Sequence, residues 1–152
     1  MSLILGVDPG DMTGYSLWED NVEIERGILS DFDFYIFLDA LPERGEIERI
    51  IYEDFRLLKG KAAAIASQAK GRRMVASQVI GACKLAAVRA KCPTTAMPTG
   101  NLPILYAHAG MKQATNHALS HGDDAYVQTR EWMQRNGRVK SRLQLRREAA
   151  GD

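Results

Sequence analysis

The chain has 152 residues, of which 45% are hydrophobic and 26% are charged, and its formal net charge is +1. That length is typical of one domain, and it is enough to bury roughly two-thirds of the surface that the unfolded chain exposes. No apolar run approaches the roughly 20 residues of a membrane span, and no basic stretch precedes the first apolar run as in a signal peptide. We therefore expect no membrane partner, a cytoplasmic location and reduced thiols at Cys83 and Cys92.

The charges are segregated along the chain. Residues 1–54 carry fourteen acidic and three basic side chains, a net charge of −11, whereas residues 55–152 carry five acidic and seventeen basic ones, a net charge of +12. A protein that attracts a polyanion through one region while holding carboxylates in another needs such a distribution. Two oppositely charged surfaces without a partner would give the same pattern, so composition alone leaves both interpretations open.

Three strands are predicted at the beginning of the chain. Residues 3–8 form a short apolar run, typical of a strand buried on both faces, and Pro9-Gly10 ends it. An extended pattern resumes at 14–18, and apolar and polar residues then alternate through 22–29. Short strands that follow one another at this spacing predict a meander.

The rest of the chain alternates helices and strands. Apolar residues at helical spacing predict a helix over 32–41 before Pro42. Short apolar runs predict a fourth strand over 47–55 and a fifth over 94–97. A long alanine-rich helix over 61–91 has two apolar faces; the sheet can cover one, and a partner subunit is a candidate for the other. A short helix is expected within 98–120, and a last helix begins near 120 or 121. We divide the chain into a domain over 1–134 and a basic, flexible or helical arm over 135–152.

Carboxylates occur at three places in this arrangement. Asp8 lies on a buried strand and Glu53 ends the apolar run of the fourth strand, where an uncompensated charge is costly unless it is paired or binds a metal. Asp123 and Asp124 lie near the start of the last helix, and His121 shares a helical face with Asp124. An acid at a helix start is usually a cap or a partner of the helix dipole, which alone would explain Asp123. Metal-dependent phosphodiester hydrolysis, however, requires carboxylates from separate elements to converge on divalent ions.

The motifs around these acids resemble those of RuvC-type Holliday-junction resolvases, which belong to the ribonuclease H-like superfamily. Residues 4–10, followed by Thr13-Gly14-Tyr15, look like the opening motif of that family. Tyr52-Glu53, Ser77-Gln78 with Gly81, and residues 121–125 match later motifs in the same order. The resemblance implies an α/β protein with the ribonuclease H-like fold. Its five-stranded mixed sheet would have three antiparallel strands and then two parallel ones, flanked by helices.

The same resemblance implies a site and a reaction. Asp8, Glu53 and Asp124 would bind two Mg²⁺ ions, or Mn²⁺ in their place, with His121 as the fourth catalytic residue and Asp123 as a further candidate ligand. A homodimer would cut four-way and related branched DNA, leave 5′-phosphate and 3′-hydroxyl ends, and use no nucleotide cofactor. Phe55 is the nearest aromatic residue where the family places a wedge. The candidate contacts to DNA phosphates are Lys59, Lys61, Lys70, Arg72, Arg73 and Lys112, although a solvated helix face would explain most of them equally well.

Three alternatives stay open. Sugar kinases, Hsp70 and actin share a Gly-x-Asp-x-Gly hairpin, but they close two such domains around a nucleotide, and this chain has the length of one. Small RuvC-like nucleases act on ribosomal RNA precursors; the two-faced helix and the basic tail favour branched DNA instead. A non-catalytic DNA-binding module would keep the fold, but buried carboxylates without a function are costly to retain.

Overall fold

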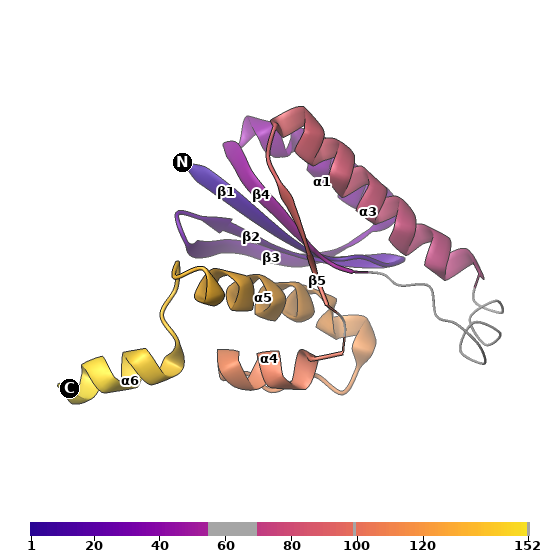
Figure 1. Cartoon of the computed structure of the whole chain (residues 1–152). Helices are drawn as coiled ribbons and strands as arrows, with labels where there is room; N and C mark the ends of the chain where they lie inside the picture. Colours follow the sequence, from indigo (N-terminus) through magenta and orange to yellow (C-terminus); the bar gives the residue numbers. More distant parts are fainter. Residues whose placement is uncertain (55–69, 99, 152) are drawn as a thin grey trace.

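The computed structural model describes residues 1–54, 70–98 and 100–151. Five strands form one mixed sheet in the order β3-β2-β1-β4-β5, with helices on both faces (Figure 1). The strands are β1 (Ser2–Asp8), β2 (Met12–Glu19), β3 (Val22–Ser30), β4 (Glu46–Glu53) and β5 (Thr94–Met97). The helices are α1 (Asp31–Ala40), the 3-10 turn η1 (Leu41–Glu43), α3 (Lys70–Ala90), α4 (Leu102–Ala109), α5 (His117–Arg135) and α6 (Arg142–Ala150).

The pairing of the strands is the one predicted. β1 pairs with β2, and β2 with β3, in antiparallel register, whereas β4 is parallel to both β1 and β5. Asp20 and Asn21 have φ values of 47° and 69°, so they form the tight turn that a two-residue hairpin requires between β2 and β3. The parallel strands are reached through helices instead, because a parallel connection has to cross the sheet.

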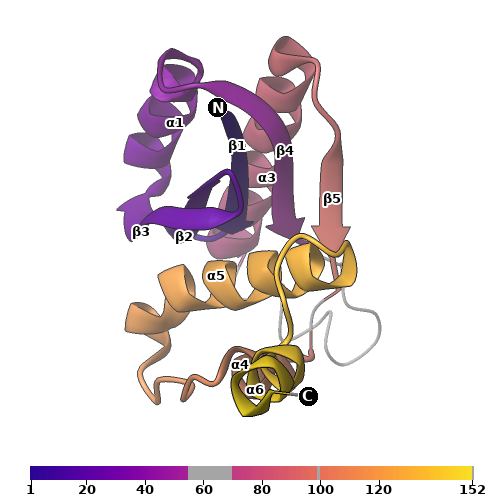
Figure 2. The same cartoon turned by 90° about the vertical axis from the view of Figure 1, so that its left-hand side faces the viewer.

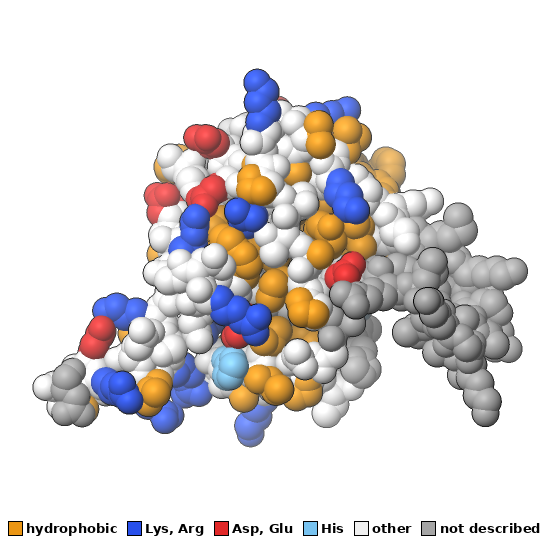
Figure 3. Space-filling model, in the orientation of Figure 1, with side chains coloured by type: hydrophobic (Ala, Val, Ile, Leu, Met, Phe, Trp, Pro, Cys, Tyr) orange, Lys and Arg blue, Asp and Glu red, His pale blue; other side chains and the backbone are white. Residues whose placement is uncertain are grey.

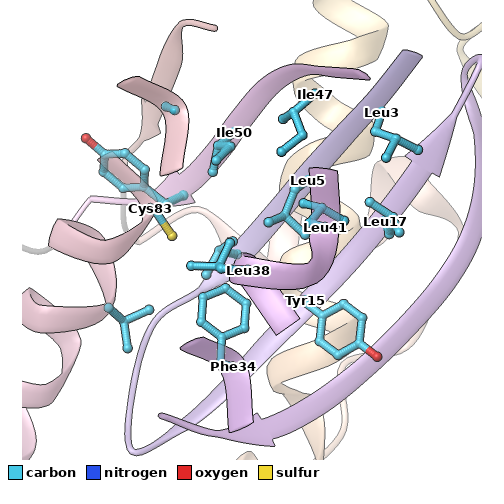
Figure 4. Close-up of a cluster of buried hydrophobic side chains, with 14 residues drawn as sticks. Leu3, Leu5, Tyr15, Leu17, Phe34, Leu38, Leu41, Ile47, Ile50 and Cys83 are labelled. Atoms are coloured by element: carbon cyan, nitrogen blue, oxygen red, sulfur yellow. The ribbon is translucent and has the colours of Figure 1, made fainter. Parts of the chain in front are cut away.

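Side chains of successive residues point to opposite faces of the sheet, and each face has its own core. Leu3, Leu5 and Val7 pack with Phe34 and Val79 under α1 and α3, and Figure 4 shows this first cluster. A second cluster lies under α5 and contains Ile4, Trp18, Ile51 and Met133. Continuing the two-residue period from Ile4 and Ile51 places Asp8 and Glu53 on the face that α5 covers.

Glycines allow α5 to approach the sheet closely. A Cβ atom at Gly14 on β2 would overlap the backbone carbonyl of His121, and one at Gly6 on β1 would overlap the Thr129 side chain. Any larger residue at these positions would push the helix away from the sheet. The glycine of the Thr13-Gly14-Tyr15 motif therefore sets the distance between β2 and the turn of α5 that carries His121.

Most predicted boundaries agree with the structure to within a few residues. The last helix begins at His117, earlier than predicted, and the Leu119 N–H donates to the Asn116 carbonyl in its first turn. The start predicted for the long helix at 61 lies outside the described residues, and α3 is described from Lys70. The arm over 135–152 contains a helix, α6, whose first turn is closed by a capping box between Ser141 and Gln144.

Both cysteines are free thiols, Cys83 buried and Cys92 partly buried, as expected for reduced thiols. None of the described helices combines the length and the apolar character that crossing a membrane would require. Trp18 is buried and stacks on Tyr126 with 5.4 Å between the ring centroids, so both rings belong to the core under α5.

Candidate metal centre

The ends of β1 and β4 meet the N-terminal half of α5 at one point. Asp8, His121 and Asp124 each bring a ligand atom to within 4.8 Å of the others. Val7 pairs with Tyr52 in the parallel register of β1 and β4, so the next residues, Asp8 and Glu53, end neighbouring strands. Asp8 is 7% exposed and Asp124 is 6% exposed, so these carboxylates are largely withdrawn from water.

His121 contacts the first of these carboxylates directly. Its Nδ1 atom lies 2.7 Å from Oδ2 of Asp8. This hydrogen bond is the main reason why the pKa of His121 is raised; partial burial opposes it, and the charges of Asp8, Asp124 and Glu53 add to it. Without a metal ion the imidazolium form is favoured, because it compensates the charge of Asp8.

Glu53 is the most perturbed acid of the group. Burial, followed by the negative charge of Asp8, raises its pKa from 4.5 to about 7. The opposing contribution comes from Gln128, whose Nε2 donates to Glu53 Oε2 at 2.9 Å. An acid in this state keeps its charge at neutral pH only at a free-energy cost, and a bound cation removes that cost.

Asp124 is held at both carboxylate oxygens. The buried Tyr106 hydroxyl on α4 donates to Oδ1 at 2.6 Å, and Ser120 donates to Oδ2 at 3.2 Å. Burial nevertheless raises the pKa of Asp124, and the neighbouring charge of Asp8 adds to the effect. The two donors fix the orientation of the carboxylate, as hydrogen bonds to a metal-binding carboxylate commonly do.

The donor set fits a hard divalent cation. Three carboxylates and one imidazole surround the point, and magnesium prefers carboxylate oxygens. Within the described part of the chain, no lysine or arginine forms an ion pair with Asp8, Glu53 or Asp124. The negative charge of the cluster is therefore compensated only in part, by His121.

Asp123 does not join this group. Its Oδ1 atom accepts a hydrogen bond of 2.6 Å from Arg26 on β3. The same guanidinium binds Glu23 and lies 3.9 Å from the centroid of the Tyr126 ring. The side chain of Asp123 thus fastens α5 to β3, while that of the adjacent Asp124 turns towards the carboxylates.

Four supporting residues were not predicted from the sequence: Arg26, Tyr106, Ser120 and Gln128. Gln128 and Ser120 lie one helical turn to either side of Asp124, a spacing that would have identified them as neighbours on one face. Tyr106 belongs to a segment with no assigned role, and its contact depends on how α4 packs against α5.

Most of the predicted phosphate contacts lie outside the described part of the chain. Lys112 is exposed between α4 and α5. Lys59, Lys61 and Phe55 lie outside the described residues, as do the side chains of Lys70, Arg72 and Arg73 in the first turns of α3.

Comparison with known proteins identifies the fold. No family model and no curated protein matches the sequence. The structure is similar to that of Thermus thermophilus RuvC in complex with a Holliday junction substrate, with a TM-score of 0.59 and 16% identity over 93% of this chain and 99% of the other. A second Thermus thermophilus RuvC structure gives 0.55 and 15% over 91% and 99%. The sheet order, the flanking helices and these similarities together show that this chain has the RuvC-like form of the ribonuclease H-like fold.

Proposed function

We propose that the chain is a magnesium-dependent endodeoxyribonuclease that resolves four-way and related branched DNA junctions. The observation that carries the proposal is the convergence of Asp8, His121 and Asp124 within 4.8 Å, with Glu53 beside them, on a RuvC-like fold. One structural neighbour is bound to a Holliday junction substrate, and this supports the same class of substrate here.

Asp8, Glu53 and Asp124 are the residues that would hold two Mg²⁺ ions, or Mn²⁺ in their place. When bound, such ions supply activation of water and stabilisation of the charge that develops on the leaving oxygen. Hydrolysis then leaves 5′-phosphate and 3′-hydroxyl ends. Tyr106, Ser120 and Gln128 keep the carboxylates in position before the substrate arrives.

His121 has a different role from the carboxylates. In the metal-free chain its Nδ1–H donates to Asp8. A cation held by Asp8 would compete for the carboxylate oxygen that raises the pKa of His121, and would so favour the neutral form of the ring. The neutral ring is then able to orient the attacking water or to accept a proton from it.

Resolution of a four-way junction requires two equivalent nicks, and a homodimer provides two equivalent sites. Apolar side chains on α1 and α3 support this: Ile36 is 55% exposed and Val88 is 73% exposed. Between these helices lies an apolar cavity of about 200 Å³ that Leu38, Ala82 and Leu85 help to line. We propose that a second copy of the chain covers this face, which sedimentation of the protein would test.

The test is cleavage of labelled four-way junction, flap, linear duplex DNA and structured RNA, with Mg²⁺, with Mn²⁺ and with chelator. We expect paired nicks in the junction only when a divalent cation is present. Asp8→Asn and Glu53→Gln should abolish these nicks, whereas Glu43→Gln, which removes an acid on η1 far from the site, should leave them unchanged. Full activity of Asp8→Asn or Glu53→Gln would exclude that residue from the mechanism, and preferential cleavage of RNA would overturn the choice of DNA.

A further inference from the structure

A second feature of the surface lies where α4, α5 and α6 meet. A cleft of about 400 Å³ is lined there by residues of all three regions, among them His108, Gln134, Arg142 and Arg146. Figures 1 and 2 show α6 beside α4 and below α5. Ten residues separate Gln134 from Asp124 on α5, so the cleft lies about 15 Å along the helix axis from the metal centre.

Specific contacts hold the start of α6 against the domain. Arg130 donates to the carbonyl oxygens of His108 at 3.4 Å and Lys140 at 3.3 Å. These hydrogen bonds tie α5 to the last turn of α4 and to the segment that precedes α6. The guanidinium of Arg142 covers Gly110, the residue with φ of 71° that ends α4. The start of the basic arm, up to Arg142, therefore lies against the domain, and Arg146, one helical turn further along α6, lines the cleft.

The cleft carries positive charge that the protein leaves uncompensated. Three neighbouring basic residues are paired with acids: Arg135 with Glu131, Arg138 with Glu48 and Lys140 with Glu148. Over the ranges 1–54, 70–98 and 100–151, by contrast, no carboxylate forms an ion pair with Arg130, Arg142, Arg146 or Arg147. Figure 3 shows Lys and Arg side chains gathered over α6 and beside it.

We propose that this arginine cleft, defined by Arg142 and Arg146, binds the phosphodiester backbone of a DNA arm at a distance from the cleaved bond. The inference rests on the proposed function and adds a second contact to it. Guanidinium groups match phosphate oxygens in geometry, and contacts to the backbone fix position without selecting sequence. At about 3.4 Å per base pair, 15 Å along α5 corresponds to four or five base pairs from the cleaved phosphate.

The experiment compares Arg146→Gln with Arg44→Gln, which also removes one positive charge but lies beside Glu25 on β3. Binding of a fluorescent four-way junction is measured by anisotropy in Ca²⁺ as a function of salt. Loss of one phosphate contact should weaken binding roughly five- to tenfold near 0.1 M salt and reduce the slope of log Kd against log salt by about one. Arg44→Gln should bind like the wild type.

A second measurement locates the contact. Single methylphosphonates, which remove one phosphate charge, are placed two to eight nucleotides from the cleaved bond on either side. Near four or five nucleotides the neutral linkage should weaken binding by the wild type but not by Arg146→Gln, because the same contact is already lost.

Equal affinities and salt slopes for Arg146→Gln and the wild type would overturn the arginine cleft while leaving cleavage, and so the proposed function, intact. If the chain bound DNA without cutting it, the proposed function would fail. The binding of Arg146→Gln compared with the wild type would still test whether the cleft contacts DNA. If Arg146→Gln weakened binding of polyglutamate alone, the cleft would serve an acidic protein segment, and the assignment to DNA would be wrong.

Discussion

Replacing Glu53 by glutamine should stabilise the metal-free protein at alkaline pH while abolishing cleavage. Glutamine keeps the shape of the side chain and an acceptor for Gln128, but it removes a carboxyl group whose pKa is raised to about 7 by burial and by the charge of Asp8. The folded chain holds the Glu53 proton more tightly than the unfolded chain does. The contribution of this group to stability is therefore fully present below pH 4.5 and is lost as the pH rises through about 7.

The size of the effect follows from the pKa values. A rise from 4.5 to about 7 corresponds to about 3 kcal/mol of unfolding free energy, at about 1.4 kcal/mol for each pKa unit. For a domain of this length, 1 kcal/mol changes the melting temperature by about 2–4 °C. Glu53→Gln should thus melt roughly 6–12 °C above the wild type at about pH 8, and close to the wild type at about pH 5.

Thermal unfolding followed by circular dichroism in chelator, over this pH range, measures the difference directly. Added Mg²⁺ should stabilise the wild type more than Glu53→Gln, because a bound cation compensates the same charge. Glu43→Gln, which also removes one carboxylate but lies on η1, is the matched control. A gap between Glu53→Gln and the wild type that stayed constant from pH 5 to pH 8 would refute the electrostatic reasoning.

Three further predictions concern the same site. Tyr106→Phe removes the hydroxyl that donates to Asp124 and keeps the ring, so Mg²⁺ affinity measured by calorimetry should fall roughly tenfold with little change in fold. Gly14→Ala introduces a methyl group where the His121 carbonyl lies, so the unfolding free energy should fall by about 1–3 kcal/mol and cleavage should be lost. Saturating Mg²⁺ should lower the pKa of His121, followed by NMR, because the cation replaces the proton that now compensates Asp8.

Each of these predictions has its own control. Tyr35→Phe also removes a buried tyrosine hydroxyl, one without a hydrogen-bond partner in the described structure, and it should leave Mg²⁺ affinity unchanged. Gly137→Ala affects a glycine with open space around it but a φ of 69°, so it should cost stability without abolishing cleavage. In Asp8→Asn the pKa of His121 should already be low and should respond little to Mg²⁺. If His121 titrated identically in both proteins, its pairing with Asp8 would not be the cause of the shift.

The sequence predicts the position of the carboxylates well, for a physical reason. The two-residue period of a strand places Asp8 on the same face as Ile4, and Glu53 on the same face as Ile51, so an apolar pattern determines where the acids point. The three-residue spacing of His121 and Asp124 likewise puts both on one side of α5. Local periodicity therefore predicts which residues of one element share a face with each acid.

Periodicity does not predict contacts between elements that are distant in sequence. Successive residues of a helix point about 100° apart, so Asp123 and Asp124 have different surroundings, but only the position of Arg26 on β3 shows that Asp123 forms an ion pair. Tyr106 reaches Asp124 because α4 packs beside α5. Neither contact has a spacing rule, since both depend on the packed arrangement of the elements.

Helix α5 connects the candidate metal centre with the arginine cleft. Its N-terminal half carries His121 and Asp124, its C-terminal half lines the arginine cleft with Gln134, and Gly6 and Gly14 let its backbone lie directly on the sheet. A helix held along this much of its length cannot tilt at one end without overlapping β1 or β2 at the other. The distance between the metal centre and a DNA phosphate bound in the arginine cleft would then be fixed by the helix itself, so that binding an arm in the cleft would also position the bond to be cut.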